Sequence, residues 1–309
     1  MYDVIIIGGG PAGLTAGIYC SRAMLGTLIL EKGAVGGQIL STAAIENYPG
    51  VPSVDGFTLM SNFKNQAEEF GAVIKSGDIV SFSYNENTDE KIIKLSNGDE
   101  YSSKTLIIAS GARPNSLNIK GESDFTGKGI SYCATCDGAF FRDKEVAVFG
   151  GGNSAIEEAL FLTRFVKKVY LVHRRQEFRA TKILVERAKK NEKIDFVLDT
   201  VADEFIGNSK LEKIRLKNAV TGKTITLDVE GAFMYVGYIP NSESFKGVVD
   251  MNEKGYIIAD SETLETNIPG VYAAGDIREK MLRQVATAVG DGAVASFSVE
   301  KYIEELKNK

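Results

Sequence analysis

The 309-residue chain has one histidine and only three cysteines, and each scarcity excludes a class of protein. Three cysteines are too few for the disulfide framework of a small secreted domain. The usual structural zinc site is also excluded, because it needs four cysteine or histidine ligands, and we predict no metal. Sparse cysteines instead suit a reducing compartment, so we expect a cytoplasmic protein.

The sequence also lacks an excess of charge of either sign and a long apolar run. Its 36 basic and 41 acidic side chains give a net charge of −5, so nothing attracts the whole chain to nucleic acid or to an anionic membrane. The beginning, MYDVIIIGGG, has no basic region and its apolar run is interrupted by glycines. We therefore expect no signal peptide, no spanning helix, and neither nucleic acid nor membrane as a partner.

What the sequence does contain is one glycine-rich motif written twice. Residues 4–16, VIIIGGGPAGLTA, align with residues 146–158, VAVFGGGNSAIEE. In each copy a buried strand leads through a glycine turn into a helix. The first glycine permits a tight turn, the second a close approach to a pyrophosphate, and the third small residue allows close helix packing. The motif predicts two dinucleotide sites, with Gly8, Gly10 and Gly13 in one and Gly150, Gly152 and Ala155 in the other.

The end of the second strand in each copy distinguishes the two nucleotides. The strand at 27–30 ends at Glu31, 23 residues after Gly8, where a carboxylate can bond a ribose that has a free 2′-hydroxyl. The equivalent position in the second copy opens a basic cluster of His173, Arg174, Arg175 and Arg179. Arginines suit a 2′-phosphate, although a solvated basic edge is the alternative. We interpret the first site as an FAD site and the second as an NADPH site.

A Cys-x-x-Cys sequence, CATCD at 133–137, lies just upstream of the second glycine motif. Beside a dinucleotide fold, such a lone pair of cysteines favours redox activity over a structural or metal-binding role. Disulfide exchange needs an attacking thiolate and a proton donor for the leaving sulfur. Asp137, shielded by Phe140 and Phe141, can hold that proton, and a turn or N-cap carboxylate is the alternative. The third cysteine, Cys20, is expected to be a small buried hydrophobe.

The remaining pattern predicts an α/β fold of two Rossmann-like three-layer domains. We expect helices at 56–70, 153–165, 180–190 and 283–306, and strands at 72–83, 91–96 and 105–109. The steps at Pro114 and at Pro240-Asn241 mark boundaries, and the last segment is too short to fold alone. An NADPH-binding domain of residues 115–241, carrying the Cys-x-x-Cys, is therefore inserted into a discontinuous FAD-binding domain of residues 1–114 and 242–309. Two parallel linkers make a hinge.

These residues, with several further motifs, resemble the low-molecular-weight bacterial thioredoxin reductases over essentially the whole chain. The further motifs are Gly36-Gly37-Gln38, Glu46-Asn47-Tyr48-Pro49-Gly50, HRRQEFR at 173–179, Gly275-Asp276 and Arg283-Gln284. Tyr238 is a departure, because many members carry a different polar residue at this position.

The resemblance implies a homodimeric, NADPH-dependent reductase of thioredoxin or a thioredoxin-like protein. It implies that Cys136 faces the flavin, that Cys133 attacks the partner disulfide, and that Asp137 donates the proton. The implied FAD-binding residues are Gly8, Gly10, Pro11, Ala12, Gly13, Glu31, Gly37, Gln38, Asn47, Gly111, Gly275, Asp276, Arg283, Gln284 and Val285. The implied NADPH-binding residues are Gly150, Gly152, Asn153, Ser154, Ala155, His173, Arg174, Arg175 and Arg179.

The order of the motifs adds one expectation about movement. Cys136 and Gly150 belong to the same inserted domain, so the disulfide and the nicotinamide compete for the space next to the flavin. We expect this domain to rotate about linkers near Pro114 and Asn241 and to present each in turn. Two alternatives stay open at this point: a ferredoxin-fed reductase or dithiol oxidase of the same architecture, which the arginine cluster disfavours, and a flavin-binding redox sensor without turnover.

Overall fold

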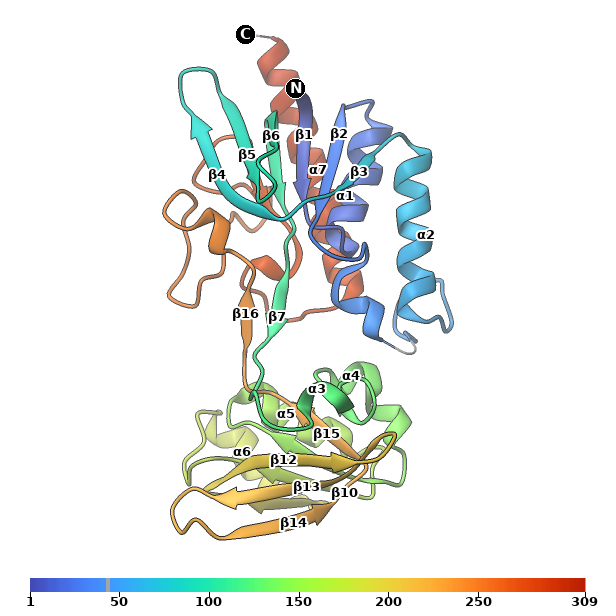
Figure 1. The fold of residues 1–309 in the computed structure, drawn as a ribbon, viewed down its shortest axis with the longest axis vertical. Coiled ribbons are helices and arrows are strands. Elements are labelled where there is room, and N and C mark those ends of the chain that lie inside the picture. Colours follow the sequence, from blue (N-terminus) through green and yellow to red (C-terminus); the bar gives the residue numbers. More distant parts are fainter. Residues whose placement is uncertain (43–44, 309) are drawn as a thin grey trace. The chain divides into compact units, whose positions relative to one another are not determined.

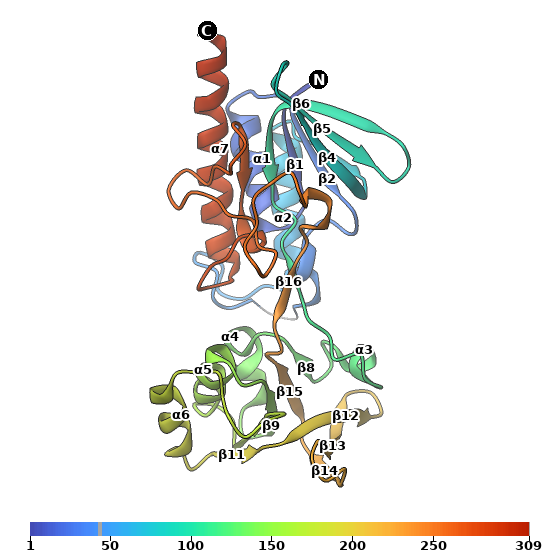
Figure 2. The same cartoon turned by 90° about the vertical axis from the view of Figure 1, so that its left-hand side faces the viewer.

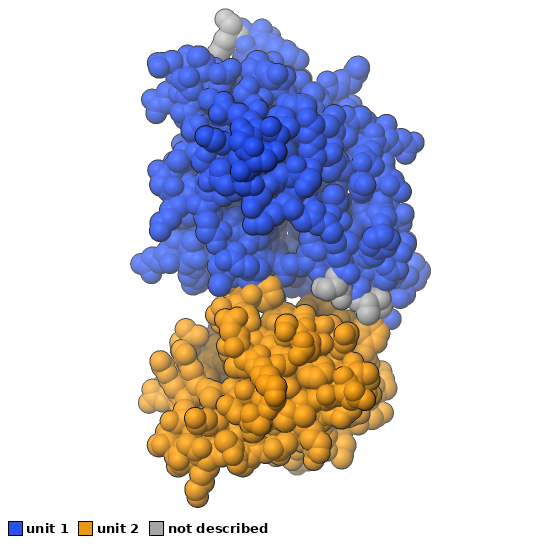
Figure 3. Space-filling model, viewed as in Figure 1, with its two compact units in different colours: residues 1–113, 239–309 blue, residues 114–238 orange. Residues whose placement is uncertain are grey.

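The computed structural model describes residues 1–42 and 45–308, and the chain divides into two compact units. The first unit consists of residues 1–113 and 239–309, and the second of residues 114–238 (Figure 3). The second unit therefore starts one residue before position 115 and ends three residues before position 241. Two short strands, β7 (Ala112–Pro114) and β16 (Tyr238–Pro240), pair with each other where the chain passes from one unit to the other.

The first unit is built on a seven-stranded sheet (Figure 1). Its strand order is β3-β2-β1-β6-β5-β4, with β17 also beside β6. All pairings are parallel except those that join β4 to β5 and β5 to β6. The strands are β1 (Tyr2–Ile7), β2 (Thr27–Glu31), β3 (Val73–Ser76), β4 (Ile79–Asn85), β5 (Glu90–Leu95), β6 (Glu100–Ile108) and β17 (Val271–Ala273).

Both faces of this sheet are buried around β1, which explains the continuous apolar run of that strand. Val4 and Ile6 pack on the helical side, whereas Ile5 and Ile7 pack with β4, β5 and the segment 245–277. Alternate side chains of a strand point to opposite faces, so a strand covered on both sides is apolar throughout. Figure 2 shows the longest helix, α7, running beside α1. The helices are α1 (Pro11–Arg22), α2 (Gly56–Glu69) and α7 (Val285–Lys307).

The stretch 72–83, expected as one strand, is two strands, and the single-strand prediction is wrong. β3 pairs parallel with β2, whereas β4 pairs antiparallel with β5, so the chain changes partner between them. A Cβ placed on Gly77 would lie 2.7 Å from Cδ1 of Leu95. A side chain at this position would crowd Leu95, and glycine stands at the point where one strand ends and the next begins.

The second unit has a five-stranded parallel sheet of order β11-β10-β9-β15-β8. Helices cover one face and a three-stranded antiparallel sheet, β12-β13-β14, covers the other. Its strands are β8 (Ile130–Ser131), β9 (Glu145–Phe149), β10 (Lys168–Val172), β11 (Ile194–Val197), β12 (Thr200–Gly207), β13 (Leu211–Asn218), β14 (Thr224–Asp228) and β15 (Gly231–Met234). Its helices are α3 (Glu122–Phe125), α4 (Ala134–Asp137), α5 (Asn153–Leu162) and α6 (Lys182–Lys189).

The α/β class and the two sheets with a layer on each face are thus as predicted from the sequence. The four expected helices are present as α2, α5, α6 and α7, with ends shifted by up to three residues. Within residues 1–42 and 45–308, the structure has no helix long and apolar enough to span a membrane.

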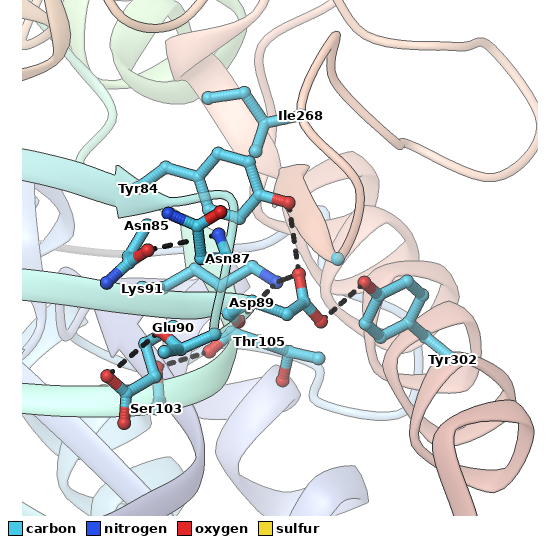
Figure 4. Close-up of polar contacts among 12 residues, drawn as sticks. Tyr84, Asn85, Asn87, Asp89, Glu90, Lys91, Ser103, Thr105, Ile268 and Tyr302 are labelled. Atoms are coloured by element: carbon cyan, nitrogen blue, oxygen red, sulfur yellow. Dashed lines mark hydrogen bonds and ion pairs between the residues drawn. The ribbon is translucent and has the colours of Figure 1, made fainter. Parts of the chain in front are cut away.

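A buried ion pair ties the β4–β5 hairpin of the first unit to α7 (Figure 4). The fully buried Lys91 places its Nζ 2.7 Å from Oδ1 of Asp89, whose other oxygen accepts a hydrogen bond of 2.8 Å from Tyr302. The rings of Tyr84 and Tyr302 lie 5.1 and 5.2 Å from the same ammonium group. A buried charge is tolerated only with such partners, so these contacts fix the hairpin against the end of α7.

Candidate active site and nucleotide-binding sites

The first glycine turn is closed by backbone contacts that exclude side chains. Gly8 has φ +107°, and a Cβ on it would lie 2.4 Å from the carbonyl oxygen of Ala109. A Cβ on Gly13 would lie 1.9 Å from the carbonyl oxygen of Gly8. These two positions therefore need glycine for the strand to turn directly into α1.

Gly10, in contrast, faces open space at the beginning of α1. A Cβ built on it would meet no atom closer than the carbonyl oxygen of Gly36, at 4.0 Å. The helix begins at Pro11 with no side-chain cap, so the N–H groups of its first turn are left without a side-chain acceptor. N–H groups that no side chain caps, next to open space at a glycine, can bind the pyrophosphate of a dinucleotide.

Glu31 lies at the end of β2, where its carboxylate is held by two backbone N–H groups. Oε2 accepts from Gly9 at 2.6 Å and Oε1 accepts from Gly33 at 2.8 Å. The carboxylate is thereby fixed beside the glycine turn, where the ribose of a nucleotide bound at α1 would lie.

Asp276 carries the clearest sign of an absent partner in the first unit. Its Oδ1 is buried and has no hydrogen-bond partner among the described residues, and burial raises the pKa of the carboxyl. The turn that carries it is braced, because the N–H of Gly275 donates to Oδ2 of Asp291 at 2.8 Å. Asp291 also binds Arg278 and Lys280, at 2.9 and 2.7 Å. A ligand hydroxyl would satisfy the buried oxygen of Asp276.

The other residues expected at this site come from distant parts of the sequence but lie in the same unit. The Nδ2 of Asn47 donates to Oε1 of Gln284 at 2.9 Å, and the side-chain amide of Gln38 donates to the carbonyl of Ala112. The guanidinium of Arg283 lies 5.1 Å from the centre of the Tyr256 ring. The remaining four are Ala12, buried in α1, Gly37 at the start of the 3₁₀-helix Gly37–Ser41, Gly111 with φ +68°, and Val285, buried at the start of α7.

The second glycine turn repeats this construction. Gly150 has φ +150°, and a Cβ on it would lie 2.6 Å from the carbonyl oxygen of Tyr235 and 2.7 Å from Cβ of Ala155. A Cβ on Gly152 would meet no atom within 4 Å, and α5 begins after this glycine with no side-chain cap. The exposed Asn153 and Ser154 form the first turn of α5. This turn also offers uncapped N–H groups to an anion.

The basic stretch 173–179 lies against this second turn. The N–H of Arg179 donates to the carbonyl of Gly151 at 2.8 Å. Three arginines of the stretch are exposed, namely Arg174, Arg175 and Arg179. Their positive charge, next to an anion-binding helix N-terminus, suits a further phosphate group.

The ring of His173 packs against the second glycine turn. It is 8% exposed, its ring stacks on Phe178 at 4.9 Å, and its Nε2 lies 3.1 Å from the carbonyl oxygen of Glu177. Burial lowers the pKa of His173, and the charge of Arg174 lowers it further, so the imidazole is held neutral. A Cβ on Gly151 would lie 2.2 Å from the ring, so His173 forms a wall behind the glycine turn.

Cys133 and Cys136 form a disulfide, with their Cα atoms 5.3 Å apart. Cys133 is the N-cap of α4, and its Sγ accepts a hydrogen bond of 3.2 Å from the N–H of Cys136. Both cysteines are half-buried. A sulfur that accepts a hydrogen bond from a backbone N–H is placed where its thiolate is stabilised.

Asp137 follows the disulfide and is set up to carry a proton. Oγ of Ser131 donates to its Oδ2 at 2.6 Å, and burial raises the pKa of this carboxyl. The side chain caps no helix, although Asp137 stands at the N-cap of the 3₁₀-helix Gly138–Phe141, so the capping alternative lacks its hydrogen bond. Ser131 was not identified from the sequence, because no motif distinguishes it from other serines.

Cys20 lies apart from this chemistry. It is 1% exposed in the α1 core, and burial raises the pKa of its thiol to about 12. A buried thiol with a raised pKa is unreactive at neutral pH. Among the described residues, no group of three or more His, Cys, Asp or Glu side chains could hold a metal ion.

Comparison with known proteins places these features in one family. A family model described as pyridine nucleotide-disulphide oxidoreductase matches residues 2–292. The thioredoxin reductases of Listeria innocua and Bacillus subtilis are each 46% identical to this chain, over 99% of it and over 95% and 96% of their own lengths. The crystal structure of thioredoxin reductase from Streptococcus pyogenes is 44% identical, with a TM-score of 0.92 over 99% of both chains. The chain belongs to the pyridine nucleotide-disulphide oxidoreductases and, within them, to the thioredoxin reductase family.

Proposed function

We propose that this protein is an NADPH-dependent thioredoxin reductase. The observation that carries the proposal is the half-buried Cys133–Cys136 disulfide, which lies beside a carboxyl of raised pKa in the unit that has the arginine-flanked glycine turn. The full-length similarity to thioredoxin reductases supports the same activity.

FAD is the dinucleotide proposed for the first unit and NADPH the one proposed for the second. At the first site, the turn at Gly10 takes the pyrophosphate, Glu31 takes the ribose and Asp276 takes a hydroxyl of the flavin side chain. At the second site, the turn at Gly152 takes the pyrophosphate and the exposed arginines take the 2′-phosphate. When bound, the flavin carries two electrons from the nicotinamide to the cysteine pair.

The cysteines then perform a balanced thiol–disulfide exchange. The Cys133 thiolate attacks one sulfur of the partner disulfide and forms a mixed disulfide, which releases the other partner sulfur as a thiolate. The Cys136 thiolate next attacks Sγ of Cys133, which restores the intramolecular disulfide and releases the second partner sulfur. Asp137 supplies a proton to a leaving thiolate, and burial raises the pKa of its carboxyl, which favours the protonated form.

The proposal includes a rotation of residues 114–238 between the two half-reactions. The chain crosses between the units only through the paired strands β7 and β16. Two short connections that lie side by side allow one unit to turn as a body, because few backbone groups have to change conformation.

A homodimer and a cytoplasmic location complete the proposal. Exposed apolar side chains lie together on α1 and α7, where Tyr19, Val294 and Phe297 are 51%, 39% and 56% exposed. Such a patch suits a second copy of the chain. Reduction of the Cys133–Cys136 pair needs a supply of NADPH in a reducing compartment, and the cytoplasm provides both.

A donor and acceptor matrix tests the proposal. The purified protein would be assayed with NADPH, NADH and reduced ferredoxin as donors and with thioredoxins as acceptors. We expect continuous turnover with NADPH and a thioredoxin. Turnover with ferredoxin alone would instead support the ferredoxin-fed alternative, and a single reduction without turnover would support a redox sensor.

A further inference from the structure

Two tyrosines hold the backbone on either side of Cys133. The N–H of Ala134 donates to Oη of Tyr235 at 2.6 Å, and Oη of Tyr238 donates to the carbonyl oxygen of Tyr132 at 3.0 Å. The two peptide groups that flank Cys133 are therefore each bonded to a phenol. Both phenols come from one short segment, residues 235–238, which follows β15 and reaches the first residue of β16.

This segment is itself anchored inside the second unit. The N–H of Tyr235 donates to the carbonyl of Phe149, the last residue of β9, at 2.8 Å. The carbonyl oxygen of Tyr235 lies against Gly150, where a Cβ would come within 2.6 Å of it. The carbonyl of Gly237 accepts from the N–H of Asn115 at 2.9 Å. The backbone that carries Tyr235 and Tyr238 is therefore fixed to the sheet and to the second glycine turn.

The helix that follows Cys133 is too short to hold this residue without such help. α4 has four residues, and the N–H groups in the first turn of a helix have no partner within it. In the oxidised protein the disulfide itself fixes Cys133. Once that bond is reduced, the contacts that hold the backbone of Cys133 include the two phenols, the 3.1 Å bond from its own N–H to Oγ of Ser131, and the 3.1 Å bond that its carbonyl accepts from the N–H of Asp137.

Tyr235 is suited to act as a neutral acceptor for the Ala134 N–H. Burial holds the pKa of Tyr235 well above its usual value, and the nearby Glu158 carboxyl adds to this effect. The phenol therefore keeps its proton over the whole working pH range. Its oxygen remains a hydrogen-bond acceptor in both redox states of the cysteines.

We propose that Tyr235 and Tyr238 are positioning residues of the Cys133–Cys136 couple, which keep the reduced dithiol in the geometry that closes to the disulfide. The proposal rests on the redox role proposed above for this pair. Two thiols held close together form a disulfide more readily than two that move apart, because less entropy is lost on closure. Loss of either phenol therefore makes the disulfide easier to reduce.

The test is a redox titration of Tyr235→Phe and Tyr238→Phe, each of which removes only a hydroxyl. The flavin-loaded protein would be equilibrated without oxygen in graded mixtures of reduced and oxidised dithiothreitol, quenched with acid and alkylated in denaturant with a mass-adding maleimide. A gel then counts the free thiols, and Cys20 adds a constant one. The matched control is Tyr170→Phe, whose hydroxyl lies in the same unit but donates to Glu145 at 2.9 Å.

We expect each variant to shift the equilibrium about fivefold toward the dithiol, which is the effect of one neutral hydrogen bond. Converted at about 30 mV per tenfold change, this is a rise of about 20 mV in reduction potential. The double variant should shift by about 25-fold if the two bonds act independently. Tyr170→Phe should leave the equilibrium unchanged.

The proposal is overturned if both single variants stay within about twofold of the original protein, which is below the effect of one hydrogen bond. It is equally overturned if Tyr170→Phe shifts the equilibrium as much as they do, because the effect would then be one of general stability. The titration needs neither NADPH nor thioredoxin. A protein that fails to reduce thioredoxin but shows these shifts would therefore refute the proposed function and leave the positioning role standing.

Discussion

The two glycine turns have the same backbone construction, but the strands beside them end in opposite chemistry. In the first unit β2 ends in Glu31, whose carboxylate is fixed by the N–H groups of Gly9 and Gly33. In the second unit β10 is followed by the neutral, buried His173 and by exposed arginines. In the function proposed here, the end of one strand selects the nucleotide, and the glycine turn takes its pyrophosphate.

The units differ again in where they carry reactive groups. The second unit has the disulfide and the carboxyl of Asp137, both on or beside a four-residue helix. The first unit has no disulfide among its described residues, and its buried charges brace structure, as in the Asp291 cluster behind Gly275. We therefore propose that the first unit binds FAD and that the second unit, besides binding NADPH, exchanges disulfides.

The largest expected effect comes from Cys136→Ser, which removes the exchange chemistry from the second unit alone. Disulfide reductase activity should fall by on the order of 10⁴-fold or more, because no second thiol remains to resolve the mixed disulfide. Flavin binding should be unchanged, since the first unit is untouched. The measurements are turnover with thioredoxin and the flavin absorbance of the purified variant.

Cys20→Ser is the matched control for this variant, because Cys20 is buried in the first unit. Its activity should remain close to that of the original protein. Substantial reductase activity in Cys136→Ser would mean that disulfide exchange does not depend on the cysteine pair of the second unit.

Replacement of Arg174 and Arg175 by alanine should have the next largest effect. Each charge-assisted hydrogen bond to a phosphate contributes about 1.5–3 kcal/mol, so kcat/KM for NADPH should fall by about 1000-fold. The value for NADH should hardly change, because NADH has no 2′-phosphate. Arg187→Ala, an exposed arginine in the last turn of α6, is the control. An equal fall in kcat/KM for NADPH and for NADH would contradict the assignment of Arg174 and Arg175 to the 2′-phosphate.

Asp137→Asn should slow turnover by about 100-fold, as expected for loss of a general acid. Because burial raises the pKa of Asp137, its proton is present below that pKa and is lost as the pH rises through it. Turnover of the original protein should therefore decline on the alkaline side of this pKa, and the asparagine variant should lack this decline. An identical pH profile in both proteins would exclude Asp137 as the proton donor.

The smallest expected effect is that of Glu31→Gln in the first unit. The amide can still accept one of the two backbone N–H bonds, but it binds a ribose hydroxyl less strongly than a carboxylate does. FAD affinity should fall by about tenfold, which is the difference between a charge-assisted and a neutral hydrogen bond. Fluorescence titration of the flavin-free protein measures it. A fall in NADPH affinity with no change for FAD would reverse the assignment of the two units.

The parts of this fold that are local in sequence could be predicted from it. The glycine turns follow from Gly8 and Gly150, because a tight strand-to-helix turn needs backbone angles that other residues avoid. The stretch 72–83 was predicted wrongly although Ser76-Gly77-Asp78 is a turn signal within it, and the change of strand partner itself is visible only in the pairing with β2 and β5.

The contacts that complete the active site could not be predicted for a related reason. Tyr235 lies 101 residues from Ala134, and Tyr238 lies 106 residues from Tyr132. They meet because β15 pairs with both β8 and β9, which brings the end of β15 beside the cysteines. Only the cysteine spacing itself is visible as a motif, and the residues that hold it are set by sheet order.

Anaerobic titration with NADPH shows directly whether electrons pass through a flavin to the Cys133–Cys136 pair. We predict that full reduction of the flavin-loaded protein consumes about two equivalents of NADPH, one for the flavin and one for the disulfide. The Cys133→Ser/Cys136→Ser variant should consume about one, because only the flavin remains to be reduced. Equal consumption by both proteins, or a flavin that NADPH leaves oxidised, would contradict the account.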